Sequence, residues 1–255
     1  MNIVKTRAIV LKEQNFRDSS KILTLYTQQF GKLKVLAKGV KSPKSRIAGN
    51  LQQFSLLEVV LYKKEQSDFH LLSQADLVDP LEKVYNDLQR LAYGSAVLEL
   101  VNRLTAEDEP HPGLFALLTE TLRALETVKE DKLPLQLWSF ALKLSANLGY
   151  RPNLAGCTDC SRAEFKSDYL LFSPEKGGLI CQECARQQEF YLKLSQRGWE
   201  LMKKMLELNP HELECISTGK GRIREISEII SSLLEYHAHT RKNLNSLEFL
   251  EQLKC

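Results

Sequence analysis

The chain has 255 residues, of which 43% are hydrophobic and 26% are charged. This composition is ordinary for a globular protein and excludes a fibrous or disordered chain. No run approaches the roughly 18 apolar residues of a membrane helix, and the N-terminus lacks a signal-peptide pattern, so we expect a cytoplasmic protein. The length allows one large domain or two smaller ones.

The formal net charge of +3 is unevenly distributed along the chain. Residues 1–80 carry 13 Lys or Arg and 7 Asp or Glu, a net charge of +6. No acidic residue occurs between Asp18 and Glu58, whereas that interval holds seven basic residues. A polyanion such as a nucleic acid would therefore bind to the first third of the chain.

The first 80 residues show the two-residue hydrophobic period of short strands. Five strands are predicted, over residues 6–11, 21–27, 32–38, 56–63 and 69–78. Five short strands with loops of uneven length are typical of a small closed barrel, and the oligonucleotide-binding (OB) barrel is the commonest barrel of this size. The sequence thus predicts an N-terminal five-stranded OB-fold β-barrel.

After Pro80 the hydrophobic period changes to that of amphipathic helices. Helices are predicted over residues 81–101, 113–128, 134–148, 189–208, 223–239 and 243–253. Strands followed by helices predict an α+β multi-domain protein, with an OB domain at residues 1–80 and a helical domain at residues 81–255. An insert at about 154–186 holds most of the cysteines.

Four of the six cysteines form two C-x-x-C pairs, Cys157 with Cys160 and Cys181 with Cys184, separated by 20 residues. Two such turns complete a tetrahedral shell of four thiolates, and this spacing predicts a zinc knuckle. Disulfides or a redox dithiol are the alternatives, but a reducing cytoplasm disfavours the first and thioredoxin-like sites use one pair. Four thiolates leave no open position, so we expect one structural Zn²⁺.

A basic segment lies between the third and fourth predicted strands. Spaced cations on such a loop can follow a phosphate backbone, although a charge run is often only a solvated face. The predicted DNA-binding residues are Lys32, Lys34, Lys38, Lys41, Lys44 and Arg46. The aromatic residues of the same domain either fill the barrel or stack on bases, and the sequence leaves this open: Phe16, Tyr26, Phe30, Phe54, Tyr62 and Phe69.

No motif for chemistry on a covalent bond is found. The segment around Lys220 resembles a phosphate loop, but it lacks the first glycine and the final hydroxyl residue. No His-x-Glu accompanies the cysteine pairs, which excludes a zinc deaminase. The sequence therefore predicts a protein that is not an enzyme.

Short motifs occur in a fixed order along nearly the whole chain. They are densest at residues 17–27 (RDSSKILTLYT) and continue at 30–32 (FGK), 37–42 (AKGVKS) and 51–54 (LQQF). They resume at residues 148–152 (LGYRP), continue through the four cysteines with Phe172-Ser173 and Gly177-Gly178 between them, and end with Tyr236-His237 and 244–250 (LNSLEFL). In this ordered combination the chain resembles the RecO family of bacterial recombination mediators.

The resemblance implies an OB-fold and a helical domain with a zinc knuckle. It also implies binding of single- and double-stranded DNA and annealing of complementary strands without ATP. The implied partners are RecR, RecF in some pathways, and the tail of single-strand-binding protein. Together these proteins load RecA onto coated single strands, and the expected location is the nucleoid. The alternative function is a zinc-stabilised adaptor whose basic OB domain binds structured RNA or a protein partner.

Overall fold

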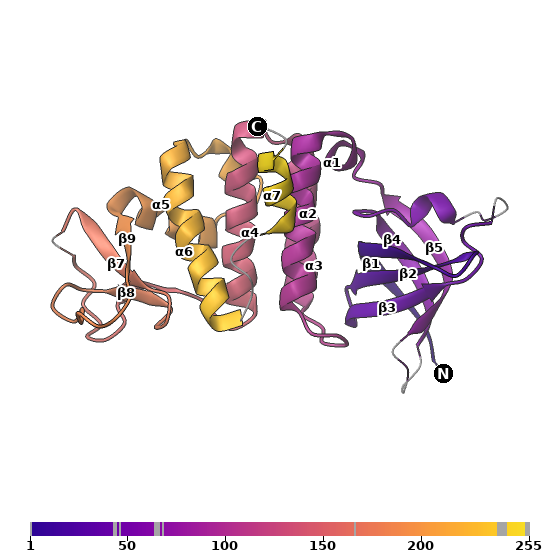
Figure 1. Cartoon of the computed structure of the whole chain (residues 1–255), viewed down its shortest axis with the longest axis horizontal. Helices are drawn as coiled ribbons and strands as arrows, with labels where there is room; N and C mark the ends of the chain where they lie inside the picture. Colours follow the sequence, from indigo (N-terminus) through magenta and orange to yellow (C-terminus); the bar gives the residue numbers. More distant parts are fainter. Residues whose placement is uncertain are drawn as a thin grey trace. The chain divides into compact units, whose positions relative to one another are not determined.

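The structure is a computed structural model that describes residues 2–42, 45, 47–63, 67, 69–165, 167–238 and 244–252. The chain forms two compact units, Met1–Thr127 and Val128–Cys255 (Figure 1). No helix among these described residues is both long and apolar enough to span a membrane. The first unit includes residues 81–127 beside the barrel. The division into an OB domain at residues 1–80 and a helical domain at residues 81–255 stays a prediction.

The first unit begins with a closed barrel of five strands in the order β1-β2-β3-β5-β4. These strands are β1 (Asn2–Phe16), β2 (Ser20–Thr27), β3 (Gly31–Ala37), β4 (Leu56–Lys63) and β5 (His70–Asp79). All neighbours are antiparallel except β3 and β5, which pair in parallel at only two positions, Val35 with His70 and Leu36 with Leu71. The predicted OB-fold barrel is confirmed.

The barrel closes because alternate residues along each strand are apolar and point inward. Leu23, Leu25, Val35, Val59 and Leu61 are all completely buried in this core. Strand β1 extends well beyond the predicted 6–11, since its first half pairs with β4 and its second half with β2. A single long strand thus contributes to two sides of the barrel.

Three helices complete the first unit: α1 (Glu82–Asn86), α2 (Leu88–Leu104) and α3 (Pro112–Thr127). The single helix predicted over 81–101 is wrong, because the chain is extended at Asp87 and splits it into α1 and α2. The Asp87 carboxylate accepts a hydrogen bond of 2.8 Å from the backbone N–H of Arg90, which caps the start of α2. Helix α2 contacts both α3 and β1.

The described residues of the second unit form four helices and a small sheet, as Figure 1 illustrates. The helices are α4 (Leu133–Asn147), α5 (Gln196–Glu207), α6 (Lys220–Ala238) and α7 (Asn245–Gln252). The strands, in the spatial order β6-β8-β7-β9, are β6 (Asn153–Cys157), β7 (Tyr169–Ser173), β8 (Gly178–Ile180) and β9 (Leu192–Ser195). Single 3₁₀ turns lie at η1 (Ala48–Asn50) in the first unit, and at η2 (Glu130–Lys132) and η3 (Glu212–Cys215) here.

The helix predicted over 189–208 is wrong in its first part. Residues Leu192–Ser195 form β9, which pairs with β7, and the helix begins only at Gln196. The Ser195 hydroxyl accepts a hydrogen bond of 3.0 Å from the backbone N–H of Gly198 and so caps α5. Four residues were too few for the hydrophobic period to separate a strand from a helix.

Candidate metal centre and nucleic-acid interface

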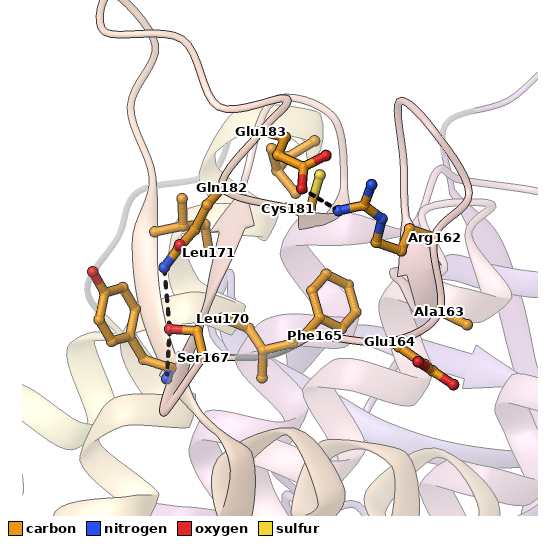
Figure 2. Close-up of a pocket in the computed structure, with 12 residues that line it drawn as sticks. Arg162, Ala163, Glu164, Phe165, Ser167, Leu170, Leu171, Cys181, Gln182 and Glu183 are labelled. Carbon is orange, nitrogen blue, oxygen red and sulfur yellow. Dashed lines mark hydrogen bonds and ion pairs between the residues drawn. The ribbon is translucent and has the colours of Figure 1, made fainter.

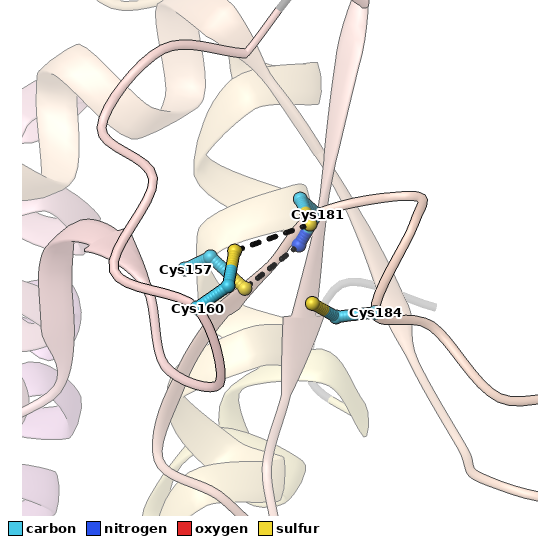
Figure 3. A group of neighbouring side chains, drawn as sticks. All are labelled: Cys157, Cys160, Cys181 and Cys184. Carbon is cyan, nitrogen blue, oxygen red and sulfur yellow. Dashed lines mark hydrogen bonds between the residues drawn. The ribbon is translucent and has the colours of Figure 1, made fainter.

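The four cysteines of the two C-x-x-C pairs converge at one end of the small sheet (Figure 3). Cys157 is the last residue of β6, and Cys181 directly follows β8. Because β6 and β8 are parallel neighbours, both turns that carry the cysteine pairs leave the same edge of the sheet. The antiparallel hairpin of β7 and β8 returns the chain to the first pair, as the sequence predicted.

The spacing of the sulfur atoms suits a tetrahedral metal ion. All four Sγ atoms lie within 4.8 Å of one another. The Sγ atoms of Cys160 and Cys181 are 3.7 Å apart. With zinc–sulfur bonds of about 2.3 Å, a regular tetrahedron requires about 3.8 Å between sulfurs. The backbone N–H of Cys181 also donates a hydrogen bond of 3.3 Å to the Cys157 Sγ, a contact that stabilises a thiolate.

Two thiols of this cluster have pKa values shifted in opposite directions. Burial raises the pKa of Cys157, but hydrogen bonds from the backbone N–H groups of Cys181, Cys160 and Asp159 outweigh burial and lower it to about 6. Hydrogen bonds with the thiols of Cys181 and Cys160, together with burial, raise the pKa of Cys184 to about 12. The protein alone thus favours a thiolate at Cys157 and a neutral thiol at Cys184, and a cation among the sulfur atoms would favour the thiolate at both positions.

Ion pairs on the surface hold the two turns together. Arg162, after the first pair, lies 2.5 Å from the carboxylate of Glu183, which belongs to the second turn. Lys176, in the β7–β8 turn, contacts Asp159 at 2.8 Å and Glu189 at 3.3 Å. The Arg162–Glu183 and Lys176–Asp159 pairs thus link the first cysteine turn to segments that follow it in the sequence.

A cavity of about 670 Å³ lies beside the cluster (Figure 2). Its lining includes Cys181, Phe165 and the Arg162–Glu183 pair. The Ser167 hydroxyl in its wall accepts a hydrogen bond of 3.1 Å from the Gln182 side-chain amide, rather than contacting a carboxylate or imidazole. The described lining residues therefore show no activated serine nucleophile.

On the barrel, two predicted DNA-binding residues lie at one end of the strands and form no ion pair with any residue that the structure describes. Lys38 and Lys41 are exposed, and the backbone N–H of Lys41 donates a hydrogen bond of 3.0 Å to the carbonyl of Ser19. This bond places the loop after β3 against the β1–β2 turn. There Arg17 is exposed and its guanidinium lies 5.2 Å from the centre of the Phe16 ring.

The other predicted DNA-binding residues have different surroundings. The Lys32 side chain is only 9% exposed, and its ammonium donates hydrogen bonds to the carbonyls of Asn102 at 2.7 Å and Thr105 at 2.5 Å. Lys34 lies 2.6 Å from the carboxylate of Glu107. Lys44 and Arg46 lie outside the described residues. This arrangement does not favour Lys32 as a DNA contact, and its role in binding stays a prediction.

Two further basic residues belong with this set and were missed from the sequence. Arg17 lies in the β1–β2 turn, which the pairing of β2 with β3 brings to the loop after β3, and it belongs to the motif RDSS that carries the family resemblance. Lys63 ends β4, where its ammonium lies 5.3 Å from the Phe30 ring centre and 2.8 Å from the Asp108 carboxylate. Nothing in the sequence around Lys63 indicated this position, because its two contacts, Phe30 and Asp108, are distant in sequence.

The aromatic residues that were candidates for stacking on bases differ in how deeply their side chains are buried. Tyr26 and Phe54 are completely buried and belong to the packing of the first unit. Phe69 is 38% exposed, and Phe16, Phe30 and Tyr62 are partly buried. Of the six candidates, only these four have ring surface that could meet a base.

Fold and cluster together define an OB-barrel protein with a helical unit that carries four cysteines able to hold a metal ion. Two family models match the sequence: "Recombination protein O N terminal" over residues 1–81 and "Recombination protein O C terminal" over residues 85–248. The chain belongs to the recombination protein O family. The predicted family is therefore confirmed.

Curated relatives match along their whole lengths. A protein of Prosthecochloris aestuarii named DNA repair protein RecO is 37% identical over 262 residues, which cover 99% of this chain and 98% of the relative. Proteins of the same name from Desulforamulus reducens and Symbiobacterium thermophilum are each 32% identical. These alignments cover 99% and 100% of this chain, and 96% and 99% of the relatives, respectively.

Proposed function

We propose that this protein binds DNA through its barrel and acts in DNA repair and recombination without catalysing a reaction. The observation that carries the proposal is the exposed group of cations at the β1–β2 turn and the loop after β3, formed by Arg17, Lys38 and Lys41. Cations gathered at one end of an OB barrel can neutralise successive phosphates, and the adjacent Phe16 offers a ring face to an unpaired base. Membership of a family named for recombination supports DNA as the ligand.

The specific activity that we propose is that of a recombination mediator. The protein would bind single- and double-stranded DNA and anneal complementary strands without ATP. Together with RecR, and RecF where it is used, it would help to load RecA onto DNA coated by single-strand-binding protein, whose C-terminal tail it would contact. The support for these partners is the family to which the chain belongs.

We further propose that the metal is a single structural Zn²⁺ held by Cys157, Cys160, Cys181 and Cys184. The sulfur spacing and the all-thiolate donor set support zinc over harder cations, which prefer oxygen ligands. Four protein ligands leave no position for a reacting water. The ion would hold the two turns of the knuckle together, and the chain's own residues at the barrel would bind the nucleic acid.

The test is binding of oligo(dT) to the purified chain by fluorescence anisotropy across a salt series. Changing Lys38 and Lys41 to Ala should weaken binding to all sequences alike. For single strands, the slope of log affinity against log salt should flatten by roughly 1.4, about 0.7 for each lost phosphate contact. The matched control is Lys83→Ala/Lys129→Ala, which removes the same charge from two exposed lysines outside the barrel.

Annealing of complementary oligonucleotides without nucleotide then tests the mediator activity. Acceleration of annealing by the wild type, and less acceleration by Lys38→Ala/Lys41→Ala than by the control, would support the proposal. Preferential binding of folded RNA would favour the adaptor function instead. Equal salt slopes for the double variant and its control would contradict binding at this end of the barrel.

A further inference from the structure

The loop between α2 and α3 lies against the first residues of β3, within the first unit. Glu107 forms a parallel β-bridge with Lys32, and the backbone N–H of Asp108 donates a hydrogen bond of 3.0 Å to the Lys32 carbonyl. Gly31 leaves room for this approach, since a Cβ atom there would stand 2.0 Å from the carbonyl oxygen of Glu109. The loop backbone is therefore docked on the barrel.

The docked loop presents two carboxylates to cations of the barrel. Glu107 lies 2.6 Å from the ammonium of Lys34 on β3, and Asp108 lies 2.8 Å from the ammonium of Lys63 on β4. The Asp108 carboxylate is also 3.9 Å from the ring of His70, the first residue of β5. Three strands thus direct basic side chains at two adjacent acidic residues.

These acidic residues reach the barrel from outside its own sequence. The barrel carries a net charge of +6, and no acid occurs between Asp18 and Glu58, the interval that includes β3. The carboxylates of Glu107 and Asp108 occupy positions beside Lys34 and Lys63 that phosphate oxygens could equally take, because lysine binds either group as a point charge.

The two ion pairs are accessible and weak. Lys34 and Glu107 expose 42% and 44% of their side chains, and Lys63 and Asp108 expose 29% and 53%. Pairs in contact with water exchange partners readily, since solvent screens their attraction. The two carboxylates can therefore rotate away from the lysines while the loop backbone stays in place on Lys32.

We infer that Glu107 and Asp108 act as internal phosphate mimics, which compete with nucleic acid for Lys34 and Lys63. This inference rests on the proposed function of the barrel and adds a mechanism that regulates it. DNA binding at Lys34 and Lys63 then requires displacement of the two carboxylates, which lowers the affinity of the barrel and reduces its salt dependence. The two carboxylates belong to the same unit as the lysines, so their effective concentration at the lysines does not depend on the protein concentration.

The test compares Glu107→Gln/Asp108→Asn with the wild type in oligo(dT) binding across a salt series. Both amides are close in shape to the acids they replace. If two lysines become available for phosphates, the slope of log affinity against log salt should steepen by about 1.4. Affinity should then rise by up to about 25-fold at 0.1 M salt, and the gain should vanish towards 1 M. The charge-matched control is Glu120→Gln/Glu207→Gln, which replaces two exposed acids on helices α3 and α5.

A second comparison assigns the gain to the two lysines. In a Lys34→Met/Lys63→Met background, the amide substitutions should no longer change affinity. The single variant Glu107→Gln, which leaves Asp108 in place, should give half of the slope change and covers the case in which the double variant folds poorly. An equal gain in the control, or a gain that persists without the lysines, would overturn the inference. If the wild type itself binds oligo(dT) without salt dependence, the proposed function fails instead.

Discussion

Replacing Lys32 by Met should destabilise the first unit and leave the DNA affinity of the folded protein unchanged. The Lys32 ammonium donates to the carbonyls of Asn102 and Thr105, at the end of α2, where the last carbonyls of a helix lack intrahelical partners. A buried cation at this end also complements the helix dipole. Burial lowers the pKa of Lys32, and the negative charge of Glu107 opposes this shift.

The magnitude follows from the two lost hydrogen bonds. Each hydrogen bond from a charged donor contributes about 1.5–3 kcal/mol, and relief from burying the ammonium offsets part of that. We therefore expect a loss of about 2–4 kcal/mol in the free energy of unfolding of the first unit. Met retains the apolar stem of the side chain, so little packing is lost.

The assay must report on the first unit alone. Both tryptophans, Trp138 and Trp199, lie in the second unit, so tryptophan fluorescence would follow the wrong part of the chain. Hydrogen exchange at the amides of β2 and β3 is specific to the barrel. For amides that exchange through unfolding of this unit, exchange should be roughly 30- to 700-fold faster, because each 1.4 kcal/mol is a factor of ten.

Lys34→Met is the matched control, since Lys34 is two residues away on the same strand but 42% exposed. It should change exchange little, because exposed ion pairs contribute less than about 1 kcal/mol. Unaltered exchange in Lys32→Met, together with a loss of DNA affinity as large as that of a basic-loop variant, would refute the structural role of Lys32.

Three further predictions concern other parts of the chain. Cys160→Ser should lose most of one equivalent of zinc by elemental analysis and lower the melting temperature of the second unit, measured by tryptophan fluorescence. Trp199 is close to the knuckle, since its indole N–H donates a hydrogen bond of 2.8 Å to the Leu154 carbonyl. The control is Cys215→Ser, which replaces an exposed cysteine and should keep the metal. Lys220→Ala should leave annealing unchanged with or without ATP, and an ATPase activity abolished by this change would contradict the prediction. Burial raises the pKa of Tyr26 to about 12, above its value near 10 in the unfolded chain. The contribution of the neutral phenol to stability is therefore complete below pH 10 and is lost as the pH rises to about 12. Tyr26→Phe should lack this alkaline loss of stability, and unfolding curves identical to those of the wild type between about pH 10 and 12 would contradict the prediction.

The cysteine cluster could be predicted almost entirely from the sequence. A C-x-x-C turn places two thiolates together through local geometry alone, and the 20-residue interval contains one hairpin that returns the chain. The barrel could be predicted equally well, because its strands alternate apolar and polar residues with a period of two. The family resemblance followed from the order of short motifs along the chain.

Helix boundaries required more than the hydrophobic period. Asp87 has an extended backbone that interrupts the predicted first helix, and its carboxylate accepts a hydrogen bond from the Arg90 N–H at the start of α2. Strand β9 forms only because β7 lies beside it. An apolar run of four residues fits either structure until a partner strand is present.

The nature of the basic surface was decided by tertiary structure. By sequence Lys32, Lys34 and Lys38 are equivalent members of one basic segment. In the folded unit, Lys32 is buried against the end of α2, Lys34 meets a carboxylate more than 70 residues away, and Lys38 is exposed. Charge in a sequence is counted along the chain, whereas its effect depends on which groups the fold brings within a few ångströms and on how much water remains between them.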